Sequence, residues 1–331
     1  MSIFRFSHSP SVVSSAAVVG GLEHQGPLGD TFDLFDHDTK FGMDSWEKAE
    51  SRMIEECTAV CLKKRGISAD QIDFAFAGDL MNQCTASSFA FRGTKIPYFG
   101  LYGACSTFVM ALGLSAMCVD SGYGKNALAL ASSHFCTAER QYRFPLEYSN
   151  QRTPTSQTTV TGCGCVIVSG DKDSEIEISE FMPGRILDLK IKDTNNMGAA
   201  MAPAALDTLF SYLNETGSDP ENFDLIATGD LGAEGKKMLK ILASQKGIEL
   251  GKNYEDCGVM IYDPVRQDVH AGGSGCGCSA SVFSAHLISL FKKKKINDML
   301  LVGTGALMSP TTALQKESIP GIAHLVRVRR K

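Results

Sequence analysis

Cys105 has the surroundings of a nucleophilic cysteine. It follows Gly103-Ala104 and precedes Ser106, at the start of a long apolar segment that runs to about Asp120. If that segment is a helix, its exposed N–H groups and positive end should lower the pKa of the thiol and favour a thiolate. The small neighbours leave room for a ligand, so the arrangement suits acyl transfer through a thioester. A small buried residue that begins a core helix would give the same pattern, and spacing alone does not separate the two interpretations.

A base for this cysteine must come from elsewhere in the chain, and histidine is the usual choice. Two of the seven histidines are placed for it: His134 ends a predicted strand at an edge that could face a pocket, and His270 precedes the loop 271–275. The favoured interpretation of both is a residue satisfied by local hydrogen bonds. His286 lies inside a predicted helix and is interpreted as a residue of the helix face.

The eleven cysteines are an odd number, and most lie in apolar or glycine-rich stretches. Free, mostly buried thiols in a reducing compartment are therefore expected. Cys163-Gly-Cys165 and Cys276-Gly-Cys278 have one residue between the cysteines, which is not the usual spacing of a zinc site. No histidine cluster completes either pair, so the sequence predicts no metal site and no cofactor.

The charge of the chain gives no sign of nucleic-acid binding, because 37 acidic and 32 basic residues leave a formal net charge of −5. Two basic clusters, Lys292–Lys295 and Arg327–Lys331, are interpreted as solvated ends of a helix and of the chain. Contact with an anionic membrane surface is the alternative. No apolar run reaches the ~18 residues of a transmembrane helix, and the N-terminus lacks the pattern of a signal peptide. We expect a cytoplasmic protein.

The elements that would hold Cys105 are helices packed on buried strands. A first helix is predicted over residues 44–65, with Asp44 as its N-cap and Gly66 at its end. Strands are predicted at 72–77, 96–99 and 126–133, and the helix after Cys105 has Phe108, Leu112, Ser115 and Val119 at helical spacing. Nearly continuous apolar strands covered by helices are typical of mixed α/β folds.

The second half of the chain repeats this order at an offset of roughly 150 to 173 residues. Residues 223–231 echo 72–80, including a Gly-Asp-Leu ending, and Gly277-Cys278-Ser279 echoes Ala104-Cys105-Ser106. The ordered match favours a duplication over a chance likeness of two α/β halves. The predicted halves are residues 1–183, which contain Cys105, and residues 184–331, with a second central helix starting near Cys278.

The segment Tyr102-Gly103-Ala104-Cys105-Ser106-Thr107 resembles the nucleophile motif of thiolases and of ketoacyl-acyl-carrier-protein synthases of the third type. The resemblance implies an α/β protein with a thiolase-like fold, built as two duplicated halves in a five-layer α/β/α/β/α arrangement. Those enzymes add a His and an Asn, or two His, that stabilise the thioester oxyanion. At the matching positions this chain has Thr228 or Gly229, and Ser274. The resemblance therefore implies a site without the usual oxyanion donors.

Further segments resemble the stage V sporulation protein AD family over residues 26–324. They are Gly26–Gly29, Asn82-Gln83, Gly103–Thr107, Ser132–His134, Thr137–Gln141, Asn196–Gly198, Met201–Ala205, Ala271–Cys276 and Gln315–Pro320. The resemblance implies a sporulation protein that binds dipicolinic acid. Such a protein acts with membrane proteins of the same operon to move dipicolinate, or its calcium chelate, into the developing spore. A homodimer and a peripheral position at the inner membrane of the forespore or spore are implied as well.

This resemblance places the ligand in the former acyl pocket, where two helix N-termini offer N–H groups to an anion. The residues expected around it are Cys105, Ser106, His134, Arg140, Thr228, Asp230, Gly273 and Ser274. Arg140 and Arg143 could each add a bidentate carboxylate contact, although surface or dimer contacts are the favoured interpretation of both. Two alternatives stay open. One is an active acyltransferase that uses Cys105 with His134 or His270, and the other is a structural scaffold for membrane partners with a vestigial pocket.

Overall fold

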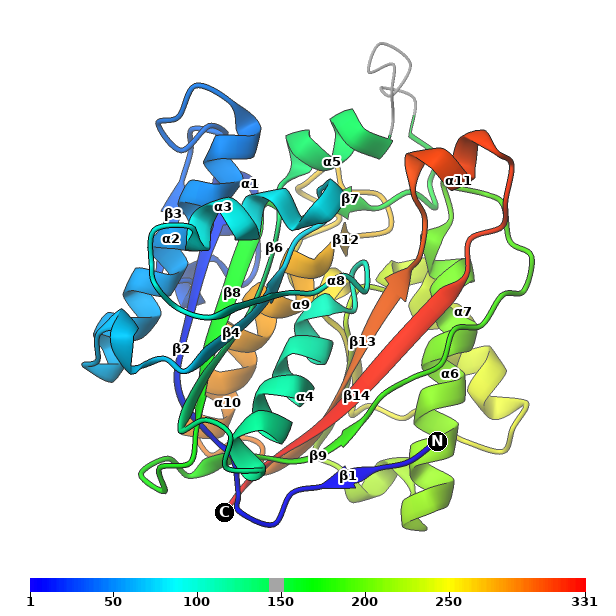
Figure 1. Cartoon of the computed structure of the whole chain (residues 1–331). Helices are drawn as coiled ribbons and strands as arrows, with labels where there is room; N and C mark the ends of the chain where they lie inside the picture. The colour runs from blue at the N-terminus through cyan, green and yellow to red at the C-terminus, as the bar shows by residue number, and fades with distance from the viewer. Residues whose placement is uncertain (143–151) are drawn as a thin grey trace.

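Helices and strands alternate in five layers (Figure 1). The computed structural model describes residues 1–142 and 152–331. One outer layer contains α2 (Trp46–Arg65) and α3 (Thr85–Phe91), and the other contains α6 (Met197–Thr216) and α7 (Gly232–Ser244). Between the two groups of strands lie α4 (Thr107–Asp120) and α9 (Cys276–Val282), which contact each other. The predicted α/β/α/β/α arrangement is confirmed.

The strands of the described residues form two groups with the same order and the same directions. The first group runs β2-β8-β6-β4-β5 and the second runs β9-β14-β13-β10-β11. Their bounds are β2 Ser11–Gly20, β8 Gly162–Ser169, β6 Asn126–Ser133, β4 Phe74–Gly78, β5 Tyr98–Gly100, β9 Ile176–Met182, β14 Gly321–Arg330, β13 Asp298–Ala306, β10 Leu225–Thr228 and β11 Tyr254–Asp256. In each group the first three strands pair antiparallel and the last three pair parallel. This shared order confirms the duplication. β9 is the first strand of the second group, although its residues lie at the end of the predicted first half, 1–183.

The strands are apolar on both faces because helices cover each sheet from both sides. Leu128 of β6 packs in the outer apolar cluster beneath α2, whereas its neighbour Ala129 belongs to the central cluster around α4. In the same way, Leu300 of β13 packs beneath α6 and Leu301 faces the centre. Alternate side chains of one strand therefore build two different cores, and the central core holds the two inner helices in place.

Helix starts differ from the predictions in two places. The side chain of Ser45, not of Asp44, caps α2 by accepting a hydrogen bond from the N–H of Lys48, while Asp44 forms an ion pair with the Lys48 ammonium group. The end of α2 at Gly66 in a left-handed conformation is as predicted. The second central helix begins at Cys276 after Gly275, whose φ of 98° is accessible to glycine. Cys278 therefore lies inside the first turn and is not the counterpart of Cys105.

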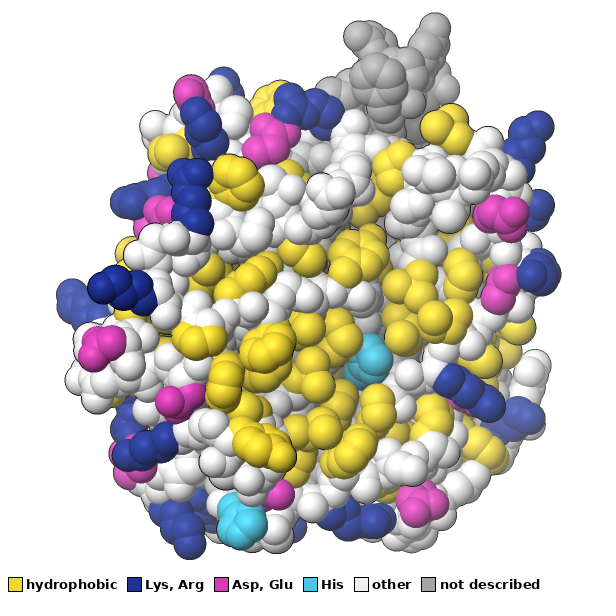
Figure 2. Space-filling view, in the orientation of Figure 1, with side chains coloured by type: hydrophobic (Ala, Val, Ile, Leu, Met, Phe, Trp, Pro, Cys, Tyr) yellow, Lys and Arg dark blue, Asp and Glu magenta, His cyan; other side chains and the backbone are white. Residues whose placement is uncertain are grey.

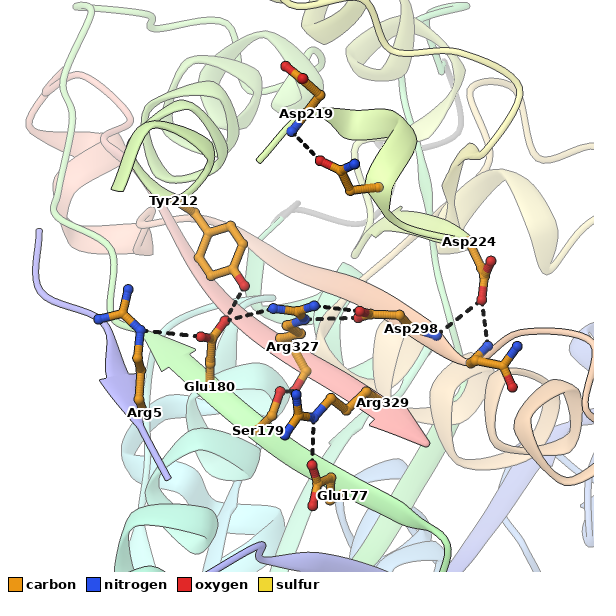
Figure 3. A network of polar contacts seen from close by, with 12 residues as sticks. Arg5, Glu177, Ser179, Glu180, Tyr212, Asp219, Asp224, Asp298, Arg327 and Arg329 are labelled. Atoms are coloured by element: carbon orange, nitrogen blue, oxygen red, sulfur yellow. Dashed lines mark hydrogen bonds and ion pairs between the residues drawn. The ribbon is translucent and has the colours of Figure 1, made fainter. Parts of the chain in front are cut away.

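The basic C-terminal strand is neutralised by carboxylates of neighbouring strands (Figure 3). Arg327 makes a bidentate contact with Asp298 at 3.0 and 2.5 Å, and Arg329 donates to Glu177 at 2.6 Å. Arg330 pairs with Glu175. These contacts tie β14 to its neighbours and pair its arginines with carboxylates. Separately, none of the helices in the described ranges combines the length and the apolar character needed to cross a bilayer.

Candidate functional site

The starts of the two central helices meet at one place between the halves of the protein. Cys105 lies two residues before α4 and Ser274 lies two residues before α9. Their Sγ and Oγ atoms are 3.9 Å apart. Ala104 holds a left-handed φ of 49°, which is unfavourable for a residue other than glycine. The hydroxyl of Ser106 fixes this turn by donating to the carbonyl of Gly103 at 2.6 Å.

Asp230 lies behind these two residues and accepts hydrogen bonds from three donors. Ser274 Oγ and the N–H of Gly275 each donate to Asp230 Oδ2 at 3.0 Å, and Thr304 Oγ1 donates to Oδ1 at 2.7 Å. The side chain is buried, and burial raises the pKa of the Asp230 carboxyl despite these hydrogen bonds. The carboxyl therefore anchors the start of α9 directly opposite the thiol of Cys105.

The prediction of a low pKa for Cys105 is wrong. Burial raises the pKa of this thiol well above its ordinary value, and the negative charge of Asp230 raises it further. The N–H of Gly275 and the hydroxyl of Ser274 oppose this rise in pKa, but they do not outweigh it. Cys105 is therefore a protonated thiol at neutral pH, because desolvation and a nearby carboxylate both disfavour the thiolate.

A cavity of about 130 Å³ opens beside Cys105 and Ser274. Both halves of the chain line it, with Leu80, Tyr102, Ala104, Ala138, Glu139, Tyr142, Ser156, Gln157 and Thr159 from the first and Thr194, Asn195, Met197, Met201, Ala306 and Met308 from the second. Most of these side chains are apolar or carry a hydroxyl or amide group. Glu139 is acidic, and the described lining residues include no lysine or arginine. The cavity therefore suits a small ligand that brings little net charge of its own.

Gln157 joins this cavity to the backbone of Asp230 and Gly273. Its Nε2 donates to the carbonyl oxygens of Asp230 and Gly273, both at 2.8 Å. Its Oε1 is buried and has no hydrogen-bond partner in the described structure. Gln157 was not predicted as a site residue, and neither were the methionines Met197 and Met201. The only sequence signal for the methionines was that they lie in segments that resemble the sporulation family.

Three predicted site residues point away from the cavity. Thr228 is buried and donates to Asp256 Oδ2 at 2.7 Å, on the far side of β10. Nε2 of His134 contacts the carbonyl oxygen of Thr39 at 2.7 Å, and burial lowers the pKa of this imidazole. Arg140 pairs with Glu47 and lies over the Trp46 ring at 5.5 Å.

The side chains of the remaining predicted residues do not line the cavity, as far as the structure describes them. Gly273 contributes only backbone to the site, through the short strand β12 (Gly273–Ser274). His270 lies 3.2 Å from Asp268 and does not line the cavity. His286 is partly buried within a helical turn, as its sequence position predicts. Arg143 lies outside the described residues.

No metal centre is formed by the described residues, where no group of three or more His, Cys, Asp or Glu side chains is arranged around a common point. All eleven cysteines are free thiols, and most are buried. The groups that the described residues bring together at the site are one thiol, its hydroxyl and amide neighbours, and the carboxyl group of Asp230.

The fold places this protein in the thiolase-like class. It is similar to the crystal structure of 3-oxoacyl-[acyl-carrier-protein] synthase III from Aquifex aeolicus VF5, with a TM-score of 0.59 and 11% sequence identity over 97% of this chain and 99% of that one. A structure of Xanthomonas campestris OleA gives a TM-score of 0.63 and 13% identity, with 98% of each chain covered. At such identities the similarity shows the fold alone.

Sequence similarity identifies the family within that class. The profile of the stage V sporulation protein AD family matches residues 2–329. The stage V sporulation protein AD of Bacillus subtilis (strain 168) is 41% identical over 319 residues, which cover 96% of this chain and 94% of the relative. The chain belongs to the stage V sporulation protein AD family, and it is therefore a sporulation protein.

Proposed function

We propose that the cavity beside Cys105 binds dipicolinic acid. In this proposal the protein is a peripheral component at the inner membrane of the forespore or spore. It passes dipicolinate to membrane proteins of the same operon that move it into the developing spore. The observation that carries the proposal is the cavity itself, which lies between the duplicated halves and ends at the thiol of Cys105. Its apolar walls suit a flat aromatic ring, and its hydroxyl and amide groups suit the ring substituents.

The charge of the lining favours the calcium chelate over the free dianion. A doubly charged ligand would enter a cavity whose described lining contains no lysine or arginine. Burying an uncompensated charge is costly. Calcium chelation offsets the two carboxylates before the ligand enters, so we expect calcium to strengthen binding.

A retired acyl-transfer site is part of the same proposal. The thiol of Cys105 is protonated at neutral pH, and the resemblance to the enzymes implies Thr228 or Gly229, and Ser274, at the positions of their His or Asn. His134, the candidate substitute base, contacts the Thr39 carbonyl and is not part of the cavity lining. The alternative of an active acyltransferase is favoured by one observation, the fold shared with the synthases. It requires a base other than the histidine that such enzymes use, because the described lining of the cavity contains no histidine.

We also propose a homodimer that forms along β5. This strand is last in the first group, so no described strand pairs with its outer edge. Phe99 on β5 is 48% exposed although it stacks on Phe76 at 5.0 Å. Apolar side chains also gather in the middle of the face on which α4 and β1 (Phe4–Arg5) lie (Figures 1 and 2). Exposed edge strands are sites of pairing with another chain.

Light scattering on the parent and on Phe99→Glu tests the proposed homodimer, with a dimer expected for the parent and a monomer for the variant. A monomeric parent would contradict it.

The proposed ligand is tested by isothermal titration of the protein with dipicolinate, with and without calcium. Isophthalate is the matched control ligand, because it has the same two carboxylates without the ring nitrogen that completes the calcium chelate. We expect saturable binding of dipicolinate that calcium strengthens, and weak binding of isophthalate in both conditions. Absence of any heat from dipicolinate would favour the scaffold alternative. A covalent acyl group on Cys105 after incubation with an acyl-CoA, discharged to a condensation product, would favour the acyltransferase.

A further inference from the structure

Four consecutive lysines begin at the last residue of α10 (Ile288–Lys292) and continue into the turn before β13. Lys292, Lys293, Lys294 and Lys295, called the lysine turn below, are all exposed. None of them forms an ion pair with a described residue, in contrast to the arginines of β14, which are paired with carboxylates. These four lysines therefore form a concentrated positive surface, although the net charge of the chain is −5.

The lysine turn is unfavourable for the isolated protein. Partial burial and the neighbouring Lys64 lower the pKa of Lys292, and Asp33, which pairs with the Lys64 ammonium group at 2.9 Å, opposes this only in part. Lys294 has a φ of 56°, a conformation that glycine adopts at Gly66 after α2 and at Gly217 after α6. A lysine there adds backbone strain to charge repulsion. Both costs would be offset if a negatively charged surface lay against the turn.

We propose that the lysine turn is the surface through which this protein contacts an anionic lipid membrane. The charges lie on an open turn, and residues 292–298 contain no aromatic side chain on which a nucleic-acid base could stack. The cavity of about 320 Å³ beside Lys292 has Asp173 and Glu175 in its wall, so it is not a pocket for a single anion. A lipid surface needs no such pocket, because it attracts each exposed lysine by roughly fivefold in affinity. The inference rests on the proposed membrane position and is independent of dipicolinate binding.

Two triple variants with the same change in net charge test this inference. Lys293→Gln/Lys294→Gln/Lys295→Gln removes three charges from the lysine turn. The control Lys48→Gln/Lys190→Gln/Lys237→Gln removes three exposed lysines that are each paired with a carboxylate, Asp44, Asp188 and Glu234. Sedimentation with vesicles of phosphatidylcholine alone, or with phosphatidylglycerol added, measures binding at low and high salt.

We expect the parent and the control to bind the phosphatidylglycerol vesicles at low salt and to be released at high salt. The lysine-turn variant should bind about a hundredfold more weakly, from three lysines at about fivefold each. A parent that does not prefer phosphatidylglycerol would overturn the inference. Equal binding by the two variants, whether retained or lost, would also overturn it. A protein that fails to bind dipicolinate but passes this test would separate the two proposals.

Discussion

The two Gly-Asp-Leu segments occupy the same place in each half and are used differently. Asp79 follows β4 and accepts hydrogen bonds from the N–H of Met81 and from the N–H and hydroxyl of Ser87, all within its own half. Asp230 follows β10 and instead reaches the start of α9, opposite Cys105 in the other half. Burial raises the pKa of both carboxyls. One copy of the repeated motif thus supports a local loop, and the other sets the environment of the thiol.

The largest effect should come from deleting either carboxyl group. Asp230→Ala leaves the donors of Ser274, Gly275 and Thr304 without their acceptor, and Asp79→Ala does the same to the donors around α3. Each buried donor left unsatisfied costs on the order of 1 kcal/mol or more. Both variants should therefore lose about 3 kcal/mol in the free energy of unfolding, measured by urea denaturation. A loss below about 1 kcal/mol at one site only would show that the two carboxyls are not equivalent supports.

Replacing each aspartate with asparagine should show that only Asp230 affects the pKa of Cys105. Asp230→Asn removes the negative charge that disfavours the thiolate, so the pKa of Cys105 should fall. While the thiol remains mostly protonated, lowering its pKa by about one should raise its alkylation rate at neutral pH about tenfold. Asp79→Asn is the matched control and should leave the rate unchanged. The rate is followed by mass spectrometry of the peptide that contains Cys105. An equal increase of the alkylation rate in both variants would mean that the replacements expose Cys105 by destabilising the protein, and not by removing a nearby charge.

The free energy of unfolding should depend on pH through the titration of Asp230. The pKa of Asp230 is raised in the folded protein, so folding favours its protonated form. Its contribution to stability is fully present below its unfolded pKa and is lost as the pH rises through the raised folded value. The stability of Asp230→Asn relative to the parent should therefore increase with pH in urea titrations. A decrease with pH would give the opposite sign and contradict the raised pKa.

The sequence predicts the fold and the convergence of the two helix starts. It predicts less well which side chains face the cavity and how they affect the pKa of Cys105. The repeated Gly-Asp-Leu and the Cys105 motif indicate which elements converge. They do not show that Thr228 faces Asp256, or that His134 contacts the backbone at Thr39, because side-chain direction at a strand end depends on the neighbouring loop. The pKa of Cys105 was mispredicted for a related reason. A helix start lowers a thiol pKa, but burial of the thiol and the carboxyl of Asp230, 125 residues further along the chain, together reverse the effect.

The smallest effect should come from removing the Ser274 hydroxyl, which lies between the thiol of Cys105 and the carboxyl of Asp230. Ser274→Ala removes one hydrogen bond to Asp230, and we expect a loss of about 1 kcal/mol in unfolding free energy. Because this hydroxyl opposes the rise in the Cys105 pKa, its loss should also slow alkylation, opposite in sign to Asp230→Asn. Ser87→Ala is the control in the other loop, where Ser87 donates to Asp79 at 2.7 Å. It should cost a similar amount without changing the alkylation rate.

Cys105 acts in the proposed function as a wall of the ligand cavity and not as a nucleophile. Calorimetric titration of Cys105→Ala and Cys105→Phe with dipicolinate and calcium tests this directly. The alanine variant keeps the space beside Ser274, so its affinity should stay within about threefold of the parent. The phenylalanine ring fills the cavity, so binding should fall by a hundredfold or more, which is about 2.7 kcal/mol, while circular dichroism shows a folded protein. Unchanged binding by folded Cys105→Phe would place the ligand elsewhere. Loss of binding in Cys105→Ala, together with loss of a thioester turnover present in the parent, would contradict the role of Cys105 as a wall.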